Sequence, residues 1–277
     1  MKHKGQKIQS FICHFYLIIL TIIAIFPLVW IILSSIKGKG ELTGNPTGFL
    51  PKTFTLEYFR HVIFDLGFIN NIKNSAGIAL VTTLIAIIVA ALAAYGIVRF
   101  FPKFGSAMSK VLVTTYIFPP ILLAIPYSIV MAKAGLVNTR IGLIIVYLSF
   151  SIPYAVWLLV GFFKSVPIGI EEAARIDGAN KIKVFGTVVL PLVAPGIVAT
   201  AIYTFINAWN EFLYSLILIN DTSKMTVGVA LRSLNGSEIL DWGDMMAASV
   251  IVVIPSIIFF CLIQNKIAGG LTEGSVK

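Results

Sequence analysis

The chain has 277 residues, of which 58% are hydrophobic and only 12% are charged, and its mean hydropathy is +0.95. A soluble globular domain carries roughly 25% charged residues, so this composition excludes a soluble enzyme, a disordered chain and a secreted disulfide scaffold. The net charge of +9 suits the inner surface of a membrane and needs no nucleic acid partner to explain it. These properties indicate a polytopic membrane protein.

Six stretches without Asp, Glu, Lys or Arg predict six transmembrane helices. Each stretch is longer than the ~18 to 20 residues that a helix needs to cross about 30 Å of hydrocarbon. The apolar residues do not alternate with polar ones as in barrel strands, so the backbone must form its hydrogen bonds within helices. The expected fold class is therefore an all-α polytopic membrane protein. Its predicted spans are 10–36, 74–98, 111–132, 141–163, 184–210 and 245–265.

The first span follows three lysines and could be mistaken for a signal peptide. It is too long for a signal core of about 7 to 15 residues, so we expect it to be retained. A slight majority of Lys and Arg falls on the cytoplasmic side if the N-terminus is cytoplasmic, which weakly supports that orientation. We expect a multi-pass protein of the bacterial inner (plasma) membrane, embedded in lipid, with both termini in the cytoplasm.

The chain lacks the motifs of common catalytic sites. No glycine-rich loop ends in Gly-Lys-Ser/Thr, and the three histidines have no zinc-type spacing. We therefore expect no catalytic residue, cofactor or metal on this chain.

A polar cluster near the outer end of the fifth span is the main candidate for a transport pathway. Asn207, Asn210 and Glu211 are spaced i, i+3, i+4, so they are predicted to share one helix face that avoids lipid. This face fits a pathway or a gate, and it fits a hydrogen bond between helices equally well. The candidate pathway residues are Asn207, Trp209, Asn210, Glu211 and Tyr214.

The segment between the fourth and fifth spans, from Lys164 to Val184, is the most charged short stretch of the chain. Pro167 can open a helix there and Gly178 can end it. This pattern predicts a short helix from Ile168 to about Asp177, too charged to cross the bilayer and lying on its cytoplasmic surface. An ordinary interfacial connector would have a similar composition.

The string Glu172-Ala173-Ala174, with Gly178 four residues further on and then Leu190-Pro191, resembles the EAA loop of ATP-binding-cassette (ABC) importer permeases. The flanking strings IPYAVWLLVGFF, AWNEF and DWGDMMAAS are similar to carbohydrate-uptake permeases, and to the shorter of the two permease subunits of maltose-type transporters. The resemblance implies a type I ABC importer transmembrane domain. It also implies that the residues coupled to the ATPase are Glu172, Ala173, Ala174, Asp177, Gly178, Leu190 and Pro191.

The resemblance further implies a domain organisation. Residues 1–69 would hold the N-terminal tail, the first span and the first external loop. Residues 70–266 would form the transporter core with its coupling loop at 164–191, and residues 267–277 a cytoplasmic tail.

The same resemblance implies a function and a set of partners. The chain would move a sugar or oligosaccharide into the cell beside a second, longer permease, although a homodimer is an alternative. Two copies of a separate ATPase would carry ATP and magnesium, and a sugar-binding protein outside the cell would meet the acidic loop 220–244. The competing interpretations are a self-sufficient secondary carrier or channel, and an ABC permease for a solute other than sugar.

Overall fold

The computed structural model describes residues 2–44, 47–101, 105, 107–108, 111–112, 114–115, 118–234 and 241–273, with side chains between residues 10 and 262. Apart from one isolated bridge between Lys37 and Phe54, this part of the chain forms only helices and loops. It divides into two compact units. Unit 1 combines Met1–Ile69 with Leu231–Ile254, and unit 2 combines Asn70–Ala230 with Pro255–Lys277.

Unit 1 contains the first span and the start of the last one. Its helices are α1 (Lys2–Ser35), α2 (Glu41–Gly44), α3 (Glu57–Arg60), the π-helix η1 (His61–Asp65) and the first turns of α13 (Trp242–Glu273). The loop after α1 folds back on that helix, where Phe49 stacks on Phe26 and Lys37 donates a hydrogen bond to the carbonyl of Gly48. This loop is thereby held to the end of α1.

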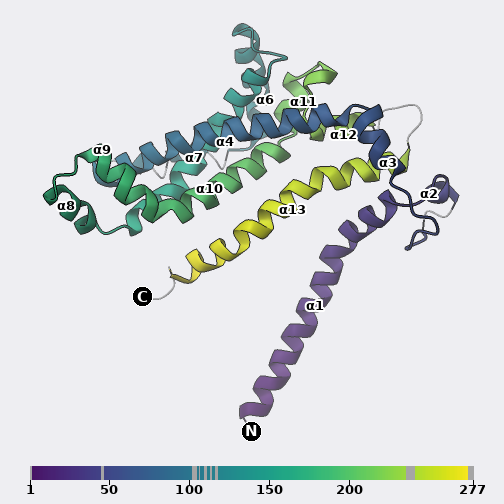
Figure 1. Cartoon of the computed structure of the whole chain (residues 1–277), viewed down its shortest axis with the longest axis horizontal. Helices are drawn as coiled ribbons and strands as arrows, with labels where there is room; N and C mark the ends of the chain where they lie inside the picture. Colours follow the sequence, from purple (N-terminus) through teal and green to yellow (C-terminus); the bar gives the residue numbers. More distant parts are fainter. Residues whose placement is uncertain are drawn as a thin grey trace. The chain divides into compact units, whose positions relative to one another are not determined.

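Unit 2 contains the remaining helices, except residues 68–69 of α4 and 231–234 of α12, and it also contains α13 from Pro255 onward (Figure 1). The long helices α7 and α10 pack against each other, and α11 packs against α6 and α7. The described helices of this unit, in chain order, are α4 (Phe68–Arg99), α6 (Pro120–Lys133), α7 (Arg140–Ser165), α8 (Ile168–Ile176), α9 (Lys181–Lys183), the π-helix η2 (Val184–Val189), α10 (Leu190–Asn210), α11 (Leu213–Leu218), the 3₁₀ helix η3 (Thr222–Lys224) and α12 (Val227–Leu234).

Five helices of the described residues are long and apolar enough to span a membrane: Ser10–Ser35, Phe68–Arg99, Arg140–Ser165, Lys181–Asn210 and Trp242–Leu262. They coincide with the predicted first, second, fourth, fifth and sixth spans. The predicted third span, 111–132, lies partly outside the described residues, and its described part contains the shorter apolar helix α6.

The side chains of α4 show why these helices belong in lipid. Its buried face carries alanines at positions 79, 86, 90 and 94, whereas its exposed face carries large aliphatic residues. Small residues let helix backbones approach closely, and large apolar residues are soluble in lipid tails but not in water. The exposed aliphatic residues are Leu80, Leu84, Ile88 and Leu92.

Candidate functional site

Helix α8 runs from Ile168 to Ile176, so the short helix predicted from Ile168 to about Asp177 is confirmed to within one residue. It ends in a left-handed turn at Gly178, whose φ of +85° favours glycine. The backbone N–H of Gly178 donates to the carbonyl of Arg175, and that of Ala179 donates to the carbonyl of Ala174. This pair of bonds forms a Schellman cap, which reverses the chain. The predicted turn at Gly178 is confirmed.

After the turn the chain returns to the fifth span through a wider helix. The side chain of Asn180 accepts from the backbone N–H of Lys183 at 2.8 Å and starts α9. The π-helix η2 follows and leads into α10 at Leu190. Pro191, near the start of α10, has no N–H to donate. The missing donor accounts for the change from the α-helical to the wider π-helical hydrogen-bond pattern just before it.

Two adjacent glutamates of α8 point to different environments. Glu171 is only 2% exposed, whereas Glu172 is exposed. The carboxylate of Glu171 accepts a hydrogen bond from the hydroxyl of Tyr95 at 2.8 Å and forms an ion pair with Arg99. Both partners lie at the end of α4. Glu171 therefore anchors α8 to the second span, and Glu172 is left at the surface.

The surface of this segment is unusually apolar for a connector. Ile176, before the turn, is 86% exposed, and Ile182, after it, is 83% exposed. Ala173 and Asp177 are exposed as well, while Ala174 packs partly against the core. Exposed large apolar residues beside charged ones are typical of protein interfaces. Of the predicted residues nearer the membrane, Leu190 is half-buried and Pro191 is exposed.

The polar cluster at the end of the fifth span has a different geometry from the predicted one. Helix α10 ends at Asn210, and Glu211 has an extended backbone with φ −67° and ψ 126°. The prediction that Glu211 shares a helix face with Asn207 and Asn210 is therefore wrong. The carboxylate of Glu211 instead accepts from the backbone N–H groups of Tyr214 (2.8 Å) and Ser215 (3.2 Å), which begin α11.

Glu211 also accepts a hydrogen bond from the hydroxyl of Tyr147 on α7 at 2.6 Å. The geometry makes Glu211 a half-buried cap that joins α11 to α7. Among the other members of the cluster, Trp209 and Tyr214 are buried, whereas Asn207 and Asn210 remain exposed.

A small cleft between α7 and α10 lies beside Asn207. Tyr154 of α7 and Tyr203 of α10 stack in this cleft with ring centroids 4.2 Å apart. Ser151 and Thr204 also line it. The cleft thus combines aromatic rings with short polar groups, and its volume of about 20 Å³ has room for a single water molecule.

The family model for the binding-protein-dependent transport system inner membrane component matches residues 83–271. The chain belongs to this family. It is 36% identical to the trehalose/maltose transport system permease protein MalG of Thermococcus litoralis, over 94% of each chain. It is 35% identical to the trehalose transport system permease protein SugB of Mycobacterium tuberculosis, over 92% of this chain and 93% of the relative.

The fold is similar to that of solved ABC importers. A chain of a bacterial ABC transporter involved in the import of the acidic polysaccharide alginate aligns with a TM-score of 0.78 and 23% identity. The alignment covers 94% of this chain and 97% of that one. The expected fold class, a type I ABC importer transmembrane domain, is confirmed.

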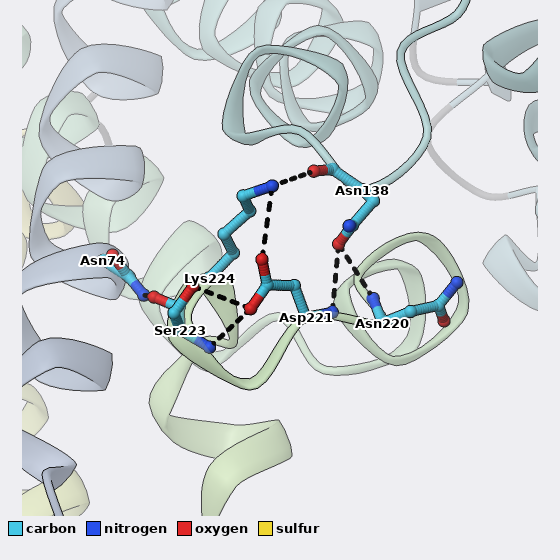
Figure 2. Close-up of polar contacts among 6 residues, drawn as sticks. All are labelled: Asn74, Asn138, Asn220, Asp221, Ser223 and Lys224. Carbon is cyan, nitrogen blue, oxygen red and sulfur yellow. Dashed lines mark hydrogen bonds and ion pairs between the residues drawn. The ribbon is translucent and has the colours of Figure 1, made fainter.

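The loop that begins at Asn220 is held at its start by hydrogen bonds to Asn138 (Figure 2). Asn138, with a positive φ of 60°, accepts from the backbone N–H groups of Asn220 and Asp221, and its carbonyl accepts from the ammonium of Lys224 at 3.2 Å. Hydrogen bonds from Ser223 hold the pKa of Asp221 below its usual range.

Further contacts join the segment after Asn220 to α4, the second span. The side-chain amide of Asn74 donates to the carbonyl of Ser223 at 2.8 Å (Figure 2), and the hydroxyl of Ser75 accepts from the backbone N–H of Val227 at 2.9 Å. The first residues of the predicted binding-protein loop, 220–244, are thus held by hydrogen bonds to Asn138 and to α4. Its residues 235–240 lie outside the described part of the chain.

Sequence reasoning missed three residues of the permease: Arg99, Tyr95 and the buried role of Glu171. Both charges lie in segments that the sequence assigns to cytoplasmic loops, where charged residues are ordinary. The available signal was that Arg99 directly ends the charge-free second span, where a partner for a half-buried guanidinium is needed.

Proposed function

We propose that this permease is a subunit of an ABC importer for a sugar or oligosaccharide, driven by a separate ATPase that docks on α8 and α9. The observation that carries the proposal is the segment's division into a buried anchor, Glu171, and an exposed docking surface, which is formed by Glu172, Ile176 and Ile182. The relatives that transport trehalose or maltose support a sugar as the cargo.

The proposed complex has further members. ATP and magnesium bind to two copies of the ATPase in the cytoplasm, where both termini of this chain also lie. A second permease, longer than this one, completes the pathway, because one chain with so few spans encloses little space. An extracytoplasmic sugar-binding protein delivers the cargo to the outer loops, as supported by the family description and by a structural relative solved with an alginate-bound periplasmic protein.

The test is purification of the tagged chain from its native membrane in mild detergent, with mass spectrometry of the proteins that accompany it. We expect a P-loop ATPase and a second permease to co-purify. Glu172→Lys should release the ATPase while retaining the second permease, because it reverses an exposed charge on the docking surface. Glu172→Gln, which keeps the shape, is the matched variant and should lose less.

Recovery of the chain without any ATPase, together with uptake that follows an ion gradient, would overturn the importer proposal in favour of a secondary carrier. If the ATPase co-purifies, but cells that lack this chain lose uptake of amino acids and not of sugars, the ABC architecture is retained and the proposed cargo changes.

We further propose that the Tyr154–Tyr203 cleft and the exposed amides of Asn207 and Asn210 line the pathway. At about 1.5 Å per residue, Tyr203 lies roughly 20 Å from the Leu190 end of α10, which is well inside a hydrocarbon core of about 30 Å. Aromatic belts form at the membrane surfaces, so a tyrosine pair at this depth favours a water-filled pathway over a lipid contact.

Replacing Tyr203 with alanine is expected to raise the KM of sugar uptake roughly two- to tenfold, the range of one aromatic contact. Asn207→Leu should have a similar effect through the lost hydrogen bonds. Val198→Ala, at an exposed position of the same helix, is the control and should leave the KM unchanged. Unaltered kinetics in both pathway variants, with normal protein levels, would remove the cleft from the pathway.

A further inference from the structure

A buried ion pair joins the proposed docking helix to the second span. We infer that Arg99 and Glu171 are positioning residues that pass the movement of α8 to α4 during transport, with Tyr95 holding the carboxylate in place. This inference rests on the proposed function, since it concerns the same ATPase-facing segment. It assigns a role to residues outside the docking surface itself.

The contacts at this joint are numerous and directional. Arg99 donates from Nε to the carboxylate of Glu171 and from Nη2 to the backbone carbonyl of Val166 at 2.7 Å. Tyr95 donates its hydroxyl proton to the other oxygen of the same carboxylate at 2.8 Å. One guanidinium therefore grips both the start of α8 and the chain just before it. The side chain of Arg99 is only 10% exposed, so water competes little for these bonds.

Four segments meet around the ion pair. The ring of Tyr95 packs against Phe163, at the end of α7, with centroids 5.9 Å apart, and against Phe185, in η2, with centroids 4.8 Å apart. The ends of α4 and α7, the start of α8 and the entry to α10 thus share one cluster. A shift of α8 must move Glu171, and with it the groups from the three neighbouring segments.

The choice of an ion pair over apolar residues is informative. Burying two charges costs desolvation energy, and well-packed apolar residues are often at least as stable in their place. Apolar side chains can shift past one another without losing their contact. The Arg99 guanidinium, however, donates to its two acceptors only within a narrow range of geometries. This joint is therefore suited to holding one orientation under load. Adjacent acids of α8 then have separate tasks, with Glu172 facing the ATPase and Glu171 facing the transporter core.

The test measures sugar taken up per ATP hydrolysed in the purified complex, reconstituted in liposomes with its binding protein. Arg99→Lys keeps the charge but cannot reach both acceptors with a rigid fork, and Glu171→Gln keeps the shape but removes the charge. We expect each to lower this ratio roughly tenfold, a size typical of coupling between distant sites, while the ATPase still co-purifies. Tyr95→Phe should lower it less.

Controls separate this inference from the proposed function and from simple misfolding. Arg175→Lys, at an exposed position of the same helix, should behave like the wild type. The exchanged pair Arg99→Glu with Glu171→Arg should recover part of the ratio lost by either single change. If no ATPase co-purifies with the wild type, the proposed function itself fails. If the ATPase binds normally and Arg99→Lys and Glu171→Gln transport with the wild-type ratio, only the positioning role is overturned.

Discussion

Gly178→Val is expected to reduce uptake about 5- to 30-fold while leaving the protein in the membrane. A side chain at the left-handed turn costs about 1–2 kcal/mol, and a β-branched residue lies at the upper end of that range. Such a cost shifts a two-state equilibrium by a factor of about 5 to 30. The space around Gly178 is open, so the penalty falls on the turn and not on the core. A change in the turn would alter the position of Ile176 relative to Ile182, and with it the proposed docking surface.

Initial rates of uptake, normalised to protein in the membrane, measure this effect. Gly178→Asn should retain more activity than the valine variant, because asparagine tolerates a positive φ. Gly186→Ala is the matched control, since this glycine also has open space around it but lies in a helical conformation. Equal uptake by the valine variant and the wild type would mean that the shape of the turn does not matter for coupling.

Glu211→Ala is expected to lower the melting temperature of the detergent-solubilised protein by at least about 6 °C. It removes the acceptor for two backbone N–H groups of α11 and for the hydroxyl of Tyr147, and each unsatisfied buried group costs about 1–3 kcal/mol. Thermal unfolding followed by size-exclusion chromatography measures the change. Tyr147→Phe should give a smaller decrease, because it removes one donor and leaves the cap of α11 in place.

Glu172→Gln provides the reference for this measurement, because it alters an exposed carboxylate and should leave the melting temperature unchanged. The two roles considered for Glu211 give different results. A group that only lines the pathway would affect uptake without affecting stability. A melting temperature equal to that of the wild type would therefore contradict the structural role of Glu211.

Patterns local in sequence were sufficient for much of this protein. The charge-free stretches predict the spans because the hydrocarbon core excludes charge over a fixed thickness. The long helices extend beyond these stretches, as α4 does from Phe68 to Arg99, because a helix does not end where its polarity changes. Helix α8 was predictable for a similar reason. Its start at Pro167 and its end at Gly178 depend on the backbone preferences of single residues.

Contacts between distant segments could not be predicted in this way. Arg99 and Glu171 are 72 residues apart, and only the packing of the helices shows that each charge meets the other and not water. The break after Asn210 carries no proline or glycine to announce it. At this break Glu211 caps α11 and also accepts a hydrogen bond from Tyr147 of α7, a contact between residues far apart in the sequence.

The sequence by itself thus determined that the chain forms membrane-spanning helices and a short charged helix between two of them, since hydrophobicity and turn preferences act locally. The tertiary structure alone decided which of the two neighbouring glutamates of that helix is buried and which is exposed. Burial is a property of the assembled helices, and it turns Glu171 into an internal anchor while Glu172 remains at the surface.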